Sequence, residues 1–165
     1  MPELTWLDGY SGETVEQLLA LEGTHRIDSL VLAFEQAIDQ KAAREGSGSL
    51  TVEEQTVSAV EALEREVNNG GYHQFFVNTM EFAPVIVHTL RRIGCTKAAG
   101  ITEDAIAALR LPSLSVGEIE KVIYDDDDQR DKALGECDHR FFEYPESIEN
   151  QLFAFIKANR SKIRL

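Results

Sequence analysis

The residue types that support binding or catalysis gather in two short segments of this 165-residue chain. The first segment places a tyrosine, a histidine and two amides directly after a Gly-Gly pair: Tyr72, His73, Gln74 and Asn78. These side chains could line a small polar pocket that holds a ligand or supports an enzymatic reaction. Such clusters more often tie a turn to the core, with their amides bonded to the open backbone groups of helix ends. We therefore favour a structural role and keep the ligand or enzymatic site as an alternative.

The second segment is a run of four aspartates followed by further acids. Its side chains repeat the ligand spacing of a calcium-binding loop, at Asp125, Asp127, Gln129, Asp131 and Glu136. However, Arg130 stands where such a loop needs glycine for its sharp turn. The segment is therefore better explained as a solvated acidic junction between helices, with Asp side chains facing the positive end of the helix that follows.

No other pattern in the chain points to catalysis or to a metal. The four histidines lack the i, i+4 pairing of a helical zinc site. Cys95 and Cys137 lie far apart in no recognisable pattern, which is typical of free thiols. There is no Gly-x-Ser-x-Gly motif and no glycine-rich phosphate loop ending in Lys. We therefore predict a protein without catalytic residues, cofactor or metal.

The net charge of −13 is spread unevenly along the chain. Residues 1–70 carry 14 acids and 4 bases, and residues 118–149 carry 12 acids and 4 bases, whereas residues 150–165 carry 4 bases and no acid. This balance argues against direct binding to nucleic acid or to an anionic membrane, and it allows binding to a basic protein. Because no apolar run could span a bilayer and no secretory signal pattern opens the chain, we expect a cytoplasmic protein.

The apolar periodicity predicts an all-α protein, with about seven or eight helices in a single domain over residues 1–165. Apolar residues from Ile27 to Ile38 follow one face of a long helix, for which Thr24 is a candidate N-cap. Thr51 and Glu54 form a capping box that opens the next helix. The Asn68–Gly71 stretch is expected to end that helix, since Gly and Asn tolerate the left-handed conformation of helix C-termini.

Further helices are predicted in the second half of the chain. They cover residues 85–93 after Pro84, about 96–109, about 116–125 behind a capping box at Ser115, and 148–156. The run from Val85 to Val87 could also form a strand, but its flanks favour helix. Short loops between these segments predict that neighbouring helices pack against one another.

Rows of carboxylates on these helices could imitate DNA, because carboxylates one helical turn apart lie roughly 6 Å apart, close to the spacing of successive phosphates. A compact domain of this length measures about 40 Å, over which B-DNA carries about 24 phosphate charges. If the acids gather on one side, the local charge density approaches that of a duplex. The acids predicted to form this partner-binding surface are Asp28, Glu35, Asp39, Glu54, Glu61, Asp125, Asp126, Asp127 and Asp128.

The segment Asn69–Asn78, with the sequence Asn-Gly-Gly-Tyr-His-Gln-Phe-Phe-Val-Asn, is the most distinctive in the chain. It resembles the central motif of a bacterial family of small, acidic, helical domains, mostly of unknown function, that includes a DNA-mimic protein. The likeness is clearest over residues 50–109. It implies an all-helical fold and a structural role for the motif positions Asn69, Gly70, Gly71, Tyr72, Gln74, Phe75, Phe76 and Asn78.

The resemblance also implies a function. The DNA-mimic member is a dimer that occupies the DNA-binding surface of a transcriptional repressor, so a similar role and a homodimer are expectations for this chain. We therefore expect a non-enzymatic acidic protein whose partner is a transcription regulator or another basic DNA-binding protein. An immunity-type inhibitor of a basic nuclease is a further alternative, with the same binding physics and a different partner.

Overall fold

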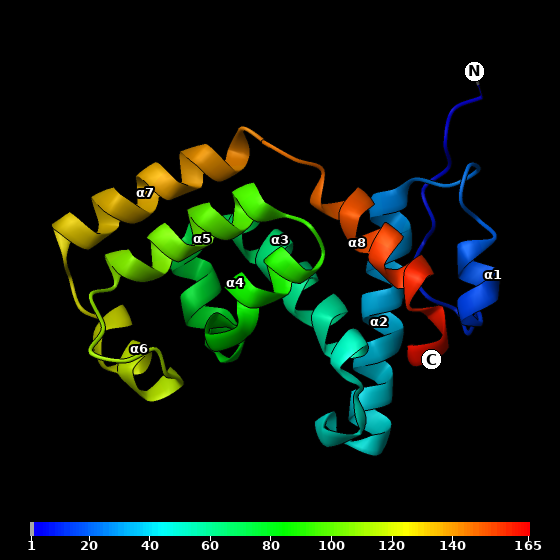
Figure 1. Ribbon diagram of the computed structural model, residues 1–165, viewed down its shortest axis with the longest axis horizontal. Helices are drawn as coiled ribbons and strands as arrows, with labels where there is room; N and C mark the ends of the chain where they lie inside the picture. Colours follow the sequence, from blue (N-terminus) through cyan, green and yellow to red (C-terminus); the bar gives the residue numbers. More distant parts are fainter. Residues whose placement is uncertain (1) are drawn as a thin grey trace. The chain divides into compact units, whose positions relative to one another are not determined.

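The computed structural model describes residues 2–165, and over that range it contains eight α-helices and no β-strand (Figure 1). The helices are α1 (Val15–Leu19), α2 (Ile27–Glu45), α3 (Val52–Asn78), α4 (Ala83–Arg92), α5 (Thr96–Ala108), α6 (Val116–Ile123), α7 (Asp128–Phe142) and α8 (Ile148–Ala158). The predicted all-α class and the predicted number of helices are confirmed. None of the helices in residues 2–165 has both the length and the apolar character needed to cross a membrane.

The helices group into two compact units. The first unit consists of the residues up to Glu61 together with Ile148–Leu165, and the second consists of Ala62–Ser147. Helix α3 therefore begins in the first unit and ends in the second. That the two units together form one domain stays a prediction.

The first unit is built on α2, which packs against α8 and α1. The predicted apolar stripe of α2 is buried, including Leu30, Phe34 and Ile38. Leu152 and Ile156 of α8 are also fully buried, as their helical spacing requires. Burial of these side chains supplies most of the driving force for packing the first unit.

The second unit contains α4, α5, α6 and α7 together with the C-terminal part of α3. Helix α5 packs against both α4 and α7, and α5 and α7 run side by side (Figure 1). Aromatic side chains from α3 fill the core, because Tyr72, Phe75 and Phe76 are all fully buried. The ring of Tyr72 meets that of Phe141 on α7 edge to face, with 5.9 Å between the ring centroids.

Two of the predicted helix caps are present and one is wrong. Thr51 Oγ1 accepts from the N–H of Glu54 and a Glu54 oxygen accepts from the N–H of Thr51, as the capping box predicts. At the start of α6, Ser115 Oγ accepts from the N–H of Glu118, so Ser115 is the N-cap, but the reciprocal bond of the predicted capping box is not formed. Thr24 is not the N-cap of α2, because that helix begins at Ile27 and the Thr24 hydroxyl donates instead to the carbonyl of Leu21.

Helix α3 bends where the sequence predicted its end. Gly70 (φ −153°, ψ 17°) and Gly71 (φ 76°, ψ −177°) leave the helical conformation, but the helix resumes at once and continues to Asn78. The predicted termination at Asn68–Gly71 is therefore a kink. Residues 85–87 lie within α4, so the strand alternative is wrong.

Candidate functional site

The kink in α3 is held by a carboxylate from α7. The N–H of Tyr72, the first residue after the Gly-Gly pair, donates to Asp138 Oδ1 at 2.7 Å. Asp138 thus satisfies a backbone donor that the restarting helix leaves open, as an N-cap residue would. A Cβ atom on Gly71 would overlap this carboxylate, and the φ of +76° strains any other L-residue. Burial raises the pKa of Asp138, and the bond from Tyr72 opposes that shift.

A second carboxylate, Glu66, joins the two halves of the bent helix. Gln74 Nε2 and Asn78 Nδ2 both donate to Glu66 Oε2, at 2.8 and 2.9 Å. A Cβ on Gly70 would overlap the side-chain amide of Gln74, so this glycine leaves room for the bond. Burial acts to raise the pKa of Glu66, but the hydrogen bonds from Gln74, Asn78 and Arg65 outweigh it and hold the pKa below its ordinary value.

The remaining polar groups of the predicted pocket also have partners inside the protein. The hydroxyl of Tyr72 lies 2.8 Å from that of Thr102 on α5, and burial raises the pKa of the tyrosine. His73 is exposed, and its Nε2 lies 3.1 Å from the carbonyl oxygen of Ile123. The polar groups around the kink therefore bond to other parts of the fold, and these bonds hold the C-terminal part of α3 against α5, α6 and α7.

The nine acids predicted to form one surface divide into two groups. Glu35, Glu54 and Glu61 are buried, with 5%, 0% and 8% of their surface exposed. This burial removes three of the nine from any surface that a partner could meet. Asp39 is exposed, and the partly exposed Asp28 receives two hydrogen bonds from the Arg26 guanidinium.

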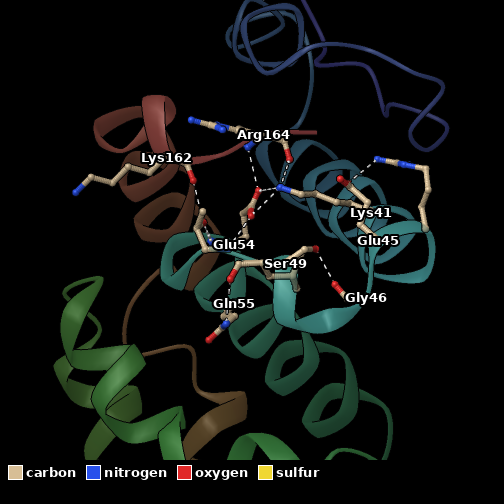
Figure 2. A network of polar contacts seen from close by, with 11 residues as sticks. Lys41, Glu45, Gly46, Ser49, Glu54, Gln55, Lys162 and Arg164 are labelled. Carbon is tan, nitrogen blue, oxygen red and sulfur yellow. Dashed lines mark hydrogen bonds and ion pairs between the residues drawn. The ribbon is translucent and has the colours of Figure 1, made fainter.

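Glu54 is the centre of a polar network in the first unit (Figure 2). Lys41 Nζ donates to both of its oxygens, at 3.0 and 2.7 Å, and also to the carbonyl of Arg164 at 3.0 Å. The N–H of Arg164 donates to Glu54 Oε2 at 3.0 Å. Burial acts to raise the pKa of Glu54, but Lys41 and the N–H groups of Thr51 and Arg164 together hold it below its ordinary value. This carboxylate joins α2, α3 and the C-terminal segment.

The acids from the last turn of α6 to the first residue of α7 have a different environment. Glu120, Asp125, Asp126 and Asp128 are exposed, and none of them forms an ion pair with another of residues 2–165. We call these four residues the α6–α7 acidic patch. All four lie within nine residues of the chain, between Glu120 and Asp128.

The neighbouring Asp127 is bound within the fold. Its Oδ1 accepts from the N–H of Arg130 at 3.0 Å, which makes it the N-cap of α7, and its Oδ2 pairs with Arg110. The hydrogen bond from Arg130 is the largest of the effects that lower the pKa of Asp127. The predicted role of the aspartates at the start of α7 is therefore confirmed for this residue.

Arg130 fixes the shape of the patch, a role that sequence reasoning missed. Its buried guanidinium donates to the carbonyl oxygens of Val122 and Asp125, at 2.6 and 2.5 Å. A cation commonly binds the open carbonyl groups at the C-terminal end of a helix, as here at the end of α6. The one available sequence signal was a base inside an acidic run.

The calcium-loop alternative fails on geometry. Helix α7 begins at Asp128, so Gln129, Asp131 and Glu136 lie along a rigid helix and cannot wrap around one ion. Across residues 2–165, no group of three or more His, Cys, Asp or Glu side chains is placed to hold a metal ion.

The comparison with known proteins gives one result, at the level of the family. A family model described as "DMP19-like protein" matches residues 48–159, which is more than half of the chain. The matched range contains the kink of α3 and the whole α6–α7 acidic patch. The chain matches no curated protein and no solved structure.

Proposed function

This chain belongs to the DMP19-like family, and on that premise we propose that it is a non-enzymatic acidic protein that occupies the DNA-binding surface of a basic protein. The partner class is a transcription regulator or another DNA-binding protein. The cationic side chains of this partner would contact carboxylates of the acidic chain in place of the phosphates of DNA.

The observation that carries this proposal is the α6–α7 acidic patch. Its four carboxylates are exposed and form no ion pair with another of residues 2–165, so they are available to the cationic side chains of a partner. A surface of this kind attracts basic partners over several ångströms and speeds their association at low salt. It also repels nucleic acid itself, which supports the mimic over a nucleic-acid binder.

The alternative of a small-ligand or enzymatic site near the Gly-Gly pair has less support. The side chains of Tyr72, Gln74 and Asn78 are bonded to Thr102 and Glu66 within the fold, and His73 faces the carbonyl of Ile123. A ligand there would have to break bonds that hold α3. We therefore propose that the α6–α7 acidic patch, rather than the kink of α3, binds the partner.

The test is capture of partners from the native cell lysate at low salt, followed by elution with duplex DNA. The patch variant Asp125→Asn/Asp126→Asn/Asp128→Asn is compared with a control that loses the same charge elsewhere, Glu3→Gln/Asp8→Asn/Glu81→Gln, whose three acids are also exposed. We expect a DNA-binding protein to be retained by the wild type and the control, released by DNA, and lost by the patch variant. Equal retention by both variants, or release that DNA does not affect, would contradict the proposal.

The identity of the captured protein separates the mimic from the immunity-type alternative. A regulator among the DNA-eluted proteins supports the proposed function. A nuclease in its place, whose activity the purified chain inhibits, would assign the same patch to toxin neutralisation.

A further inference from the structure

The outward face of α6 carries an aromatic side chain without a partner. Val116, Glu120 and Tyr124 follow one another at i, i+4 and i+8, so they form one stripe along successive turns. Tyr124 is 65% exposed, the highest value among the exposed large apolar side chains of residues 2–165. Over the same range its hydroxyl forms no hydrogen bond. The stripe therefore presents an exposed aromatic ring next to carboxylates of the α6–α7 acidic patch.

The chemistry of this face fits one kind of side chain. A guanidinium ion is planar and weakly hydrated, so it can stack on an aromatic ring while its N–H groups bond a carboxylate at the edge. An ammonium ion is compact and strongly hydrated, and it gains less from the ring. Glu120 precedes Tyr124 by one helical turn, and Asp125 and Asp126 follow it directly. Carboxylate acceptors that an arginine needs therefore flank Tyr124 along the chain.

The same chain already holds one of its own arginines in this way. In the first unit, the Arg26 guanidinium lies 5.2 Å from the centroid of the Trp6 ring. It also donates to both oxygens of Asp28, at 3.1 and 2.6 Å. The α6–α7 region offers the aromatic ring and the carboxylates of such a site, and no cation of residues 2–165 stacks on Tyr124.

We propose that Tyr124 is the arginine-binding anchor of the patch, so that the surface prefers a partner whose DNA contacts are made by arginine over one that uses lysine. The partner's guanidinium stacks on the ring, and Glu120, Asp125 or Asp126 accepts its hydrogen bonds. This inference rests on the proposed function and adds to it the residue that sets specificity.

The test uses the full chain and two fluorescein-labelled peptides of equal charge, octa-arginine and octa-lysine, with binding measured by fluorescence anisotropy at low salt. The measured quantity is the ratio of the two affinities. We expect Tyr124→Leu to lower the arginine-to-lysine ratio by about two- to five-fold, the size of an exposed cation–π contact. Tyr124→Phe, which keeps the ring, should retain most of the preference. Phe142→Leu, which removes another exposed aromatic ring, should leave the ratio unchanged.

Two other outcomes would overturn the inference in different ways. If both peptides bind, and the triple Asp→Asn patch variant weakens both, but the ratio is the same in the wild type and in Tyr124→Leu, only the role of Tyr124 is wrong. If neither peptide binds the wild type, or if the patch variant binds as well as the wild type, the patch itself is not a basic-partner surface, and the proposed function fails with it.

Discussion

The buried glutamates of α2 and α3 and the exposed aspartates around the start of α7 carry the same charged group in opposite environments. Five glutamates between residues 35 and 66 are buried: Glu35, Glu53, Glu54, Glu61 and Glu66. By contrast, Asp125, Asp126 and Asp128 lie on the surface without an ion-pair partner within residues 2–165. In the first group, Glu54 accepts hydrogen bonds from Lys41 of α2, and Glu66 accepts from Gln74 and Asn78 across the kink of α3. The second group contributes charge to the surface.

This difference shows why net charge alone is a poor guide to an interaction surface. Residues 1–70 hold more acids than residues 118–149, yet many of those acids lie in the interior. A buried carboxylate costs desolvation energy and is kept only when several donors bond it, so its removal changes stability. An exposed carboxylate changes stability little and acts on partners through its field. The predictions that follow test whether this division holds.

The largest expected effect is on stability, at Glu54. The substitution Glu54→Ala leaves the ammonium of Lys41 buried without its carboxylate, and should lower the free energy of unfolding by about 3–5 kcal/mol. Urea unfolding followed by circular dichroism measures the loss. The double variant Lys41→Met/Glu54→Leu, which removes both charges, should recover most of it. A loss below about 1 kcal/mol in the single variant would mean that Glu54 contributes no more to the free energy of unfolding than an exposed acid does.

The next largest effect is expected at the kink. Gly71→Ala forces a non-glycine residue to φ +76° and pushes its methyl group into the carboxylate of Asp138, so we expect a loss of about 2–3 kcal/mol. Gly135→Ala in α7 is the matched control, because a Cβ atom there meets nothing within 4 Å. The control should be neutral or stabilising. Equal stability of the two variants would mean that the kink is not held by Asp138.

The buried carboxylates should also control the response to acid. The folded-state pKa values of Glu54 and Glu66 are lowered, so their contribution is present above the unfolded-state value near 4.5 and is lost as pH falls through the folded-state values. Glu66→Gln should cost about 1–2 kcal/mol at pH 7 and make stability less sensitive to acid.

Asp138 provides the control of opposite sign. Its pKa is raised, so its contribution is present below the unfolded-state value of 3.8 and is lost as pH rises through the folded-state value. Asp138→Asn keeps an acceptor for the N–H of Tyr72 and should weaken that trend.

Urea midpoints measured between pH 3 and pH 7 compare the variants. Parallel curves for the wild type and Glu66→Gln would show that Glu66 does not contribute to the acid response.

The sequence predicted most of the fold because the helices obey local rules. The apolar stripe of α2, the Thr51–Glu54 capping box and the helical run after Pro84 are all set by spacings of a few residues. The kink was mistaken for a helix end because its cause is distant. Asn-Asn-Gly-Gly is a local stop signal, but Asp138, 66 residues after Tyr72, supplies the acceptor that lets the helix resume.

The site was harder to predict than the fold for the same reason. Glu54 and Glu61 are seven residues apart, so helical spacing places them on one face of α3, but it does not tell whether that face meets solvent or core. For Glu54 the answer depends on Lys41 and on Arg164, which is 110 residues away in the chain. The aspartate run was recognisable because four consecutive acids at a helix start cannot all be buried. The exposure of Tyr124 follows from tertiary packing and has no local signature.

The smallest predicted effect separates two neighbouring aspartates. Asp127 caps α7 and pairs with Arg110, whereas Asp126 has neither contact. Asp127→Ala should therefore lower the melting temperature by about 2–4 °C, the usual loss for an N-cap in a chain of this size. Asp126→Ala should shift it by about 1 °C or less, because surface substitutions away from such contacts are close to neutral.

The same pair should behave in the reverse order in binding. Asp126→Ala removes an exposed charge of the α6–α7 acidic patch, so it should weaken octa-arginine binding at low salt and reduce the dependence of that binding on salt. Asp127→Ala removes a charge that Arg110 already compensates, so it should change binding less. If Asp127→Ala mainly changes stability and Asp126→Ala mainly changes binding, even two adjacent aspartates differ in whether they act as structural or as interacting carboxylates. Matching effects of the two variants in both measurements would show that burial and pairing do not decide which acids act on a partner.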